Sequence, residues 1–164
     1  MPLTEIRPKL AQILKDADPA SPVHDYVRWA TDPETVRGFF ASKVANDPRW
    51  RGWIVHPVRK TEAPATHDDV AVDYEFELTF VYSLTDADAS EQACWDLLDR
   101  VSAHLRGHAL LNTERLSTLP AFGSETGRIG LQVEKVEAQK VSQVLCHVAT
   151  CRLVIEELVS RTAA

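Results

Sequence analysis

Cysteine, glycine and long apolar runs are all scarce in this chain. Its 164 residues include three cysteines and six glycines, and Cys94, Cys146 and Cys151 follow neither metal-ligand nor redox spacing. We therefore expect buried free thiols in a reducing compartment. No stretch approaches eighteen uninterrupted apolar residues, and the N-terminus lacks the basic-then-apolar order of a secretory signal. These absences predict a soluble protein made in the cytosol, with no membrane partner.

Positive charge is also in short supply. The chain carries 18 Lys and Arg against 24 Asp and Glu, a formal net charge of −6. No cluster of basic residues is present that could neutralise a run of phosphates, which argues against a dedicated nucleic-acid binder. The length predicts one domain over residues 1–164 with enough chain for a two-layer core.

Motifs that carry catalysis are missing as well. The sequence has no glycine-rich phosphate loop, no nucleophile elbow and no zinc-type spacing. His104 and His108 stand four apart, as two metal ligands on a helix could, but no third ligand accompanies them. His67 with Asp68 and Asp69 reads better as a polar turn. We expect no enzyme activity, no catalytic residue, no cofactor and no metal.

The most informative segment is residues 70–84 followed directly by residues 89–107. In the first part, apolar and aromatic residues alternate with polar ones, which predicts a strand that buries one face. In the second part, apolar residues recur at helical spacing. The strand positions are Val70, Val72, Tyr74, Phe76, Leu78, Phe80 and Tyr82, and the helix positions are Cys94, Leu97, Leu98, Val101 and Leu105. We therefore predict that this helix folds back across the sheet and covers its apolar face.

The remaining segments give weaker patterns. We predict helices over residues 5–16 and 33–46, and strands over residues 53–62, 128–139 and 144–158. Pro57 restricts the strand that contains it to an edge or bulged position. A helical insert is expected at about residues 23–50 and a long surface loop at about 108–127. The predicted fold class is α+β, with an antiparallel or mixed sheet of about four strands, helices packed on one face and the helical insert added.

Acidic residues occupy the polar side of the 70–84 strand. Asp73, Glu75 and Glu77 share that side, and two interpretations stay open. They form an ordinary solvated face, or they line a channel or meet a partner subunit. In a ring, such a stripe would repeat around the lumen and repel phosphate, so that DNA passes without specific binding. These three residues are the lumen or interface candidates.

The chain resembles a known family in residues 4–17, 76–105 and 128–158. The segments TEIRPKLAQILKDA, FELTFVYSLTDADASEQACWDLLDRVSAHL and RIGLQVEKVEAQKVSQVLCHVATCRLVIEEL resemble the tail-terminator or tail-completion proteins of tailed bacteriophages, of the Mu-like prophage type. The resemblance implies a structural virion protein that forms a ring, a hexamer, on the tail tube. It also implies that the ring stops tube polymerisation and provides the surface that joins the head-tail connector. The location implied is the virion tail, assembled in the host bacterial cytoplasm.

Two alternatives remain beside the tail terminator. One is a neck or head-tail adaptor protein, whose subunit could have nearly the same shape. The other is a small-ligand-binding or enzymatic α+β domain that uses a cavity between sheet and helix. Its polar groups would be Tyr74, Tyr82, His104 and His147.

Overall fold

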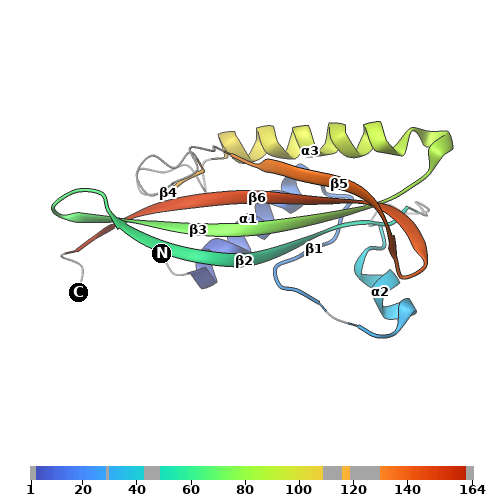
Figure 1. Ribbon diagram of the computed structural model, residues 1–164, viewed down its shortest axis with the longest axis horizontal. Helices are drawn as coiled ribbons and strands as arrows, with labels where there is room; N and C mark the ends of the chain where they lie inside the picture. Colours follow the sequence, from blue (N-terminus) through green and yellow to red (C-terminus); the bar gives the residue numbers. More distant parts are fainter. Residues whose placement is uncertain (1–2, 29, 43–48, 109–115, 119–129, 162–164) are drawn as a thin grey trace.

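The computed structural model describes residues 3–28, 30–42, 49–108, 116–118 and 130–161. Its helices are α1 (Leu3–Ala17), α2 (Pro33–Phe39), the short 3-10 helix η1 (Asp86–Asp88) and α3 (Ser90–Gly107). Its strands are β1 (Val23–His24), β2 (Arg51–Pro64), β3 (Asp69–Ser83), β4 (Leu116–Ser117), β5 (Gln132–Val141) and β6 (Val144–Ser160). Figure 1 shows the long strands running side by side along the longest axis, with α3 parallel to them.

The sheet is mixed, with four long strands and two strands of two residues. Its order is β1-β2-β3-β6-β4, and β5 also pairs with β6. The long strands pair antiparallel, while β1 pairs parallel with β2 through Val23 and His24. β3 and β6 are therefore central. Beyond Ile54, β2 pairs only with β3 in the described chain, and β5 pairs only with β6 along its whole length. These two strands therefore form edges of the sheet.

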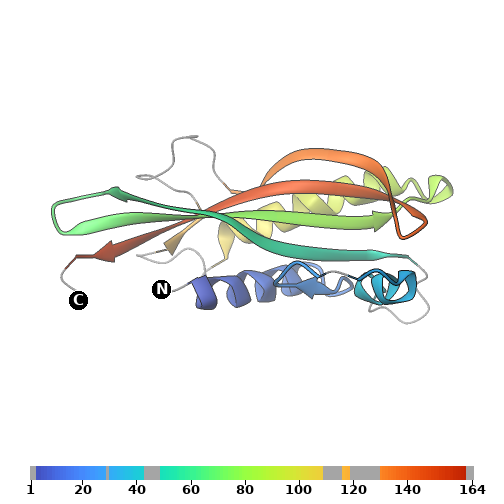
Figure 2. The ribbon, with the colours of Figure 1, turned by 60° about the horizontal axis from the view of Figure 1, so that its bottom comes forward.

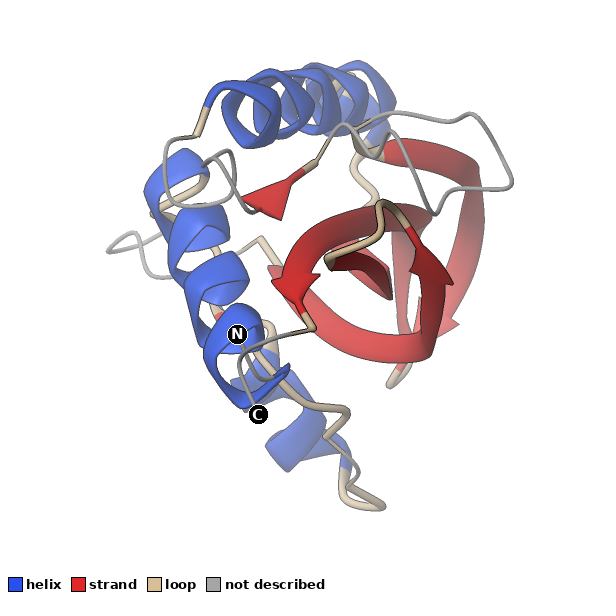
Figure 3. Ribbon diagram, turned by 90° about the vertical axis from the view of Figure 1, so that its left-hand side faces the viewer, coloured by secondary structure: helices blue, strands red, loops and turns tan. Residues whose placement is uncertain are grey.

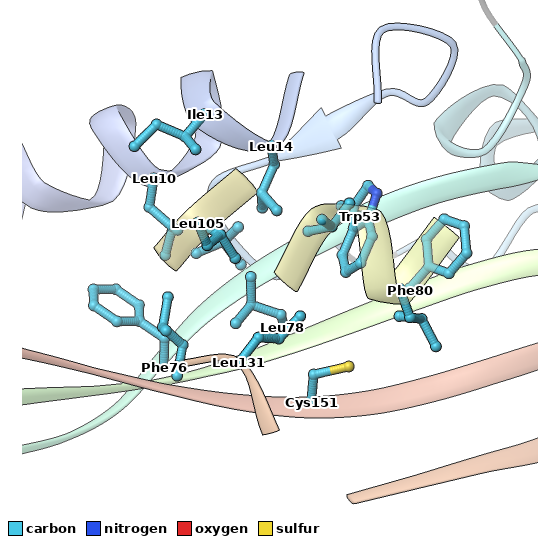
Figure 4. Packing of buried hydrophobic residues seen from close by; sticks show 14 of the residues in the cluster. Leu10, Ile13, Leu14, Trp53, Phe76, Leu78, Phe80, Leu105, Leu131 and Cys151 are labelled. Carbon is cyan, nitrogen blue, oxygen red and sulfur yellow. The ribbon is translucent and has the colours of Figure 1, made fainter. Parts of the chain in front are cut away.

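The predicted pairing of strand and helix is confirmed. The alternating residues of β3 from Val72 to Tyr82 and the apolar stripe of α3 lie in one buried cluster. Helix α1 adds Ile6, Leu10, Ile13 and Leu14 to the same cluster, and Figure 4 shows Leu10 and Leu14 pointing from the helix toward the sheet. Figures 2 and 3 show α1 and α3 on the same side of a strongly curved sheet. The α+β fold with helices on one face is as predicted.

A buried polar network holds the end of α1 against the start of β2. The Arg51 guanidinium donates to Asp18 Oδ1 at 2.7 Å, and Trp53 Nε1 donates to Asp18 Oδ2 at 3.2 Å. Arg51 Nε also donates to Ser21 Oγ at 2.9 Å. Asp18 is buried, so both of its oxygens have the partners that a carboxylate removed from water requires. The indole of Trp53 stacks on Phe80 with ring centroids 4.4 Å apart.

The insert packs on the opposite side of the sheet, at one end. Phe39 and Phe40 of α2 and its cap contact a second buried cluster with Trp50, Val81 and Val148. Asp32 caps the helix by accepting the Thr35 N–H at 2.8 Å, and Pro33 occupies the first turn.

The predicted extent of that helix is wrong, because α2 ends at Phe39 and not near residue 46. The Phe40 carbonyl accepts the Arg51 N–H at 2.8 Å, and Ala41 forms a bridge with Trp50. These bonds to the strand draw the backbone out of the helix after about two turns. Residues 29 and 43–48 of the predicted insert lie outside the described residues.

The other strands match their sequence patterns, with longer or shifted bounds. A register shift between Pro57 and Arg59 marks the predicted bulge on β2. β5 and β6 join through Ser142 and Gln143, whose φ values of 44° and 74° are those of a type I′ hairpin turn. The predicted loop at about 108–127 lies mostly outside the described residues, and within it Leu116–Ser117 pairs with β6 as β4.

The three cysteines are free and buried, as predicted. Cys151 lies in the cluster beneath the helices and Cys146 in the cluster at α2, so the two point to opposite faces of β6. Burial raises the pKa of the Cys151 thiol to about 12, which keeps it protonated and unreactive. Among the described helices, none combines the length and apolar character needed to cross a bilayer.

Candidate functional site

The candidate site is the side of the sheet that faces away from α1 and α3, which we call the open face. Because side chains alternate along a strand, the residues between the buried positions of β3 point to this side. The predicted grouping of Asp73, Glu75 and Glu77 on one side is therefore retained, and β6 places Arg152 and Glu156 across from them. The open face is rich in carboxylates, but they differ in their surroundings.

Asp73 lies on the predicted side of the strand but is not exposed to solvent. It is 6 % exposed, so the interpretation of Asp73 as part of an ordinary solvated face is wrong. The physical reason is that β3 is a central strand, so Thr61 of β2 and Glu156 of β6 stand beside Asp73 in register. Its Oδ1 atom has no hydrogen-bond partner in the described chain. Burial, and then the charge of Glu156, raises the pKa of Asp73 from 3.8 to about 6.

Glu75 is engaged in a network of charges. Arg152 NH1 contacts Glu75 Oε1 at 2.5 Å, and Arg152 Nε contacts Glu134 Oε1 at 2.8 Å. One guanidinium from β6 thus bridges carboxylates of β3 and of the bulge in β5. The carboxylates of Glu134 and Glu75 raise the pKa of Arg152 above its ordinary value. Much of the negative charge at Glu75 is therefore neutralised within the chain.

Glu77 differs from both of its neighbours. It is half-buried, with His56 and Arg152 in register on either side. Within the described residues its carboxylate has no hydrogen bond or ion pair. A carboxylate placed in this way can accept a charge-assisted hydrogen bond from a cationic group that approaches the open face.

The four polar groups considered for a small-ligand site do not line one shared cleft, although Tyr82 and His147 pair in register on β3 and β6. Tyr74 lines a cleft of about 300 Å³ at the end of the sheet with Lys60 and Glu62, and its hydroxyl donates to buried Glu157 at 3.3 Å. His147 lines a different cleft of about 340 Å³. Tyr82 lies in the main core, where its hydroxyl oxygen accepts a hydrogen bond from Arg49 NH1 at 3.3 Å.

Ser90 and His147 form a contact that no sequence pattern indicated. Ser90 Oγ lies 2.9 Å from His147 Nε2, and both side chains are buried. Ser90 Oγ also accepts the Thr85 N–H at 2.9 Å. The hydroxyl therefore fixes the turn before α3, where Ala89 adopts a left-handed conformation without a side-chain cap. The two residues stand 57 positions apart, so no local motif could have indicated the pair.

His104 and His108, the pair considered as metal ligands, lie next to each other near the end of α3. The rings of His104 and His108 lie 5.0 Å apart between centroids. No group of three or more metal-ligating side chains occurs in the part of the chain that the structure describes. Asp69 belongs to a polar turn, where its backbone N–H donates to Thr66 Oγ1 at 3.0 Å. The open face therefore offers charged groups that can recognise a partner of opposite charge.

Comparison with known proteins adds little to this geometry. No protein-family model matches the chain, and no curated protein matches it. A solved structure with 16 % identity is similar over 93 % of this chain and 89 % of that chain, with a TM-score of 0.36. The name of that structure states no function, and a TM-score this low does not establish a shared fold or function.

Proposed function

We propose that this chain is a structural virion protein of the tail-terminator type. Copies of it form a homo-oligomeric ring, a hexamer, on the end of a phage tail tube. The ring stops tube polymerisation and offers its other surface to the head-tail connector protein. The work is done by shape and binding energy, so neither a cofactor nor a catalytic residue is required.

The observation that carries this proposal is the one-sided construction of the sheet. Helices α1 and α3 cover one face. On the opposite face both ends of β3 are buried, at Asp73 and at Val81, while its middle from Glu75 to Thr79 is partly exposed. A subunit of a closed ring needs two different patches that fit each other. The open face and the edges of β2 and β5, which have no further partner strand in the described chain, are different surfaces of the molecule, as a closed ring requires.

The charge of the open face suits the proposed passage of DNA. Glu77 contributes a partly exposed carboxylate there, whereas Asp73 and Glu156 are buried, and the chain is acidic overall. Acidic groups near a lumen repel phosphate, so DNA passes through without specific binding. The location that follows is the virion tail, with assembly in the host bacterial cytoplasm.

Two measurements test the proposal. Light scattering of the purified protein, with and without tail-tube protein, is expected to give the mass of a ring and then of a capped tube end. Loss of the gene is expected to give overlong tails. If loss of the gene gives tails of normal length without heads, the chain is a head-tail adaptor instead. If the purified protein is a monomer that does not bind tube ends, both roles are excluded.

A further inference from the structure

Two exposed arginines of the insert are stacked on aromatic rings. Arg28 Cζ lies 4.0 Å from the centroid of the Phe39 ring and 5.8 Å from that of Tyr26. Arg37 Cζ lies 5.6 Å from the centroid of the Trp50 ring. Tyr26 is itself 51 % exposed. We call Tyr26, Arg28 and Arg37 the arginine surface, which lies at the α2 end of the molecule (Figure 1).

Stacking prepares these guanidinium groups for a partner. An aromatic ring beneath a guanidinium restricts its side chain while leaving its N–H donors at the rim available for a carboxylate. Neither Arg28 nor Arg37 forms an ion pair or a side-chain hydrogen bond to another described residue. Less conformational entropy is then lost when a partner binds, and Tyr and Arg are the residues enriched in the energetically dominant parts of interfaces.

The chain itself carries a matching carboxylate. Glu77, at the middle of the open face, has no ionic partner among the described residues, whereas Glu75 is held by Arg152. The insert packs at the Val81 end of that face through Phe39 and Phe40, and neither Arg28 nor Arg37 forms an ion pair with Glu77 of its own chain. Two unpaired groups of opposite sign, on different parts of one subunit, fit a head-to-tail contact.

We infer that the arginine surface of one copy binds the open face of a second copy around Glu77, and that repetition of this contact closes the ring. The inference rests on the proposed function, because it names the surfaces that the ring would use. A nucleic acid is a weaker candidate for this surface. Asp32 and Glu34 lie on the same short helix as Arg37, whereas phosphate binding needs several cations without adjacent carboxylates.

A charge-exchange series tests the contact. Arg37→Glu and Glu77→Lys each place like charges in the contact and are expected to raise the dissociation constant of the oligomer at least about tenfold. The double variant restores an opposite pair and is expected to recover most of the loss. Sedimentation velocity over a concentration series measures all three, with Arg28→Glu as a second test of the same surface. Arg100→Glu, on the exposed side of α3, is the matched control and is expected to leave the mass unchanged.

Several other outcomes would overturn the inference. Single variants that keep the wild-type mass, or a double variant no better than the singles, would mean that the ring closes elsewhere. A mass that stops at a dimer would replace the ring with a two-fold contact. If the arginine variants formed unchanged rings but bound DNA less than wild type does, the arginine surface would be a nucleic-acid contact. Wild-type rings that fail to cap tail tubes would contradict the proposed function but not this contact between copies.

Discussion

The two faces of the sheet are built from the same strands but differ in how completely their side chains are packed and paired within the chain. On the helix-covered face, Phe76, Leu78 and Phe80 are fully buried against α1 and α3, and the packing is closed within the chain. On the open face, Asp73 has an unpartnered buried oxygen and Glu77 lacks an ionic partner in the described chain. Stability is therefore concentrated on one face, while the other keeps charges available for binding.

The largest expected effect comes from opening a cavity on the helix-covered face. Phe80→Ala removes a fully buried ring that stacks on Trp53 at 4.4 Å. We expect a loss of about 3–5 kcal/mol in the free energy of unfolding, measured by urea denaturation. The matched control is Thr79→Ala, one residue away on the open face, with an expected change below about 1 kcal/mol. Equal losses for the two variants would contradict the assignment of the faces.

A second large effect is expected where α1 is held to the sheet. Asp18→Ala removes the partner of the Arg51 guanidinium and of Trp53 Nε1. The Arg51 side chain is only 12 % exposed, so its charge would be left largely buried, at a cost of about 3 kcal/mol. The double variant with Arg51→Met removes that charge and is expected to recover part of the loss in thermal denaturation. A double variant as unstable as the single one would show that the network matters for another reason.

On the open face, Asp73 is expected to make stability depend on pH. Its pKa is raised from 3.8 to about 6 in the folded protein. Between these values the folded chain keeps a proton that the unfolded chain has released, so stability falls as the pH rises through this window. Asp73→Asn replaces the carboxyl with a neutral group of similar shape. Above pH 6 it is expected to be more stable than wild type by on the order of 2 kcal/mol, with little difference below pH 4.

Urea denaturation of wild type and Asp73→Asn at a series of pH values measures this difference. Glu77→Gln serves as the control, because it removes a carboxylate from the same face without a buried oxygen. A difference between wild type and Asp73→Asn that does not change with pH would contradict the uncompensated burial of Asp73.

The smallest effect is expected at the charge network around Arg152. Its side chain is 47 % exposed and contacts Glu75 and Glu134. Because water and salt screen exposed ion pairs, Arg152→Ala is expected to cost at most about 1 kcal/mol, and less at high ionic strength. Thermal denaturation at low and high salt measures it. A loss as large as that of Phe80→Ala would remove the contrast between the two faces.

The sequence predicted the elements whose patterns are local. The alternation from Val72 to Tyr82 and the spacing from Cys94 to Leu105 each lie within one element, so they identified the strand, the helix and the faces that they bury. The bulge at Pro57 was predictable for the same reason, since proline lacks the N–H that a ladder needs.

The features that were missed depend on contacts between distant segments. The end of α2 is set by hydrogen bonds from the Phe40 region to Arg51 and Trp50, which no helix-spacing rule contains. The burial of Asp73 requires knowing that β2 and β6 flank it, and the Ser90–His147 contact joins α3 to β6. The stacked arginines likewise depend on how the insert folds onto the sheet.

The central claim is that copies of this protein meet through the insert and the open face, while the helix layer stays outside the contact. Hydroxyl-radical footprinting across the concentration range of assembly tests it with two exposed aromatic residues. These are Tyr26 at 51 % exposure on the arginine surface and Trp95 at 40 % on the outer side of α3. We predict that Tyr26 becomes protected on assembly while Trp95 stays reactive. Protection of Trp95 with Tyr26 unchanged would contradict the account.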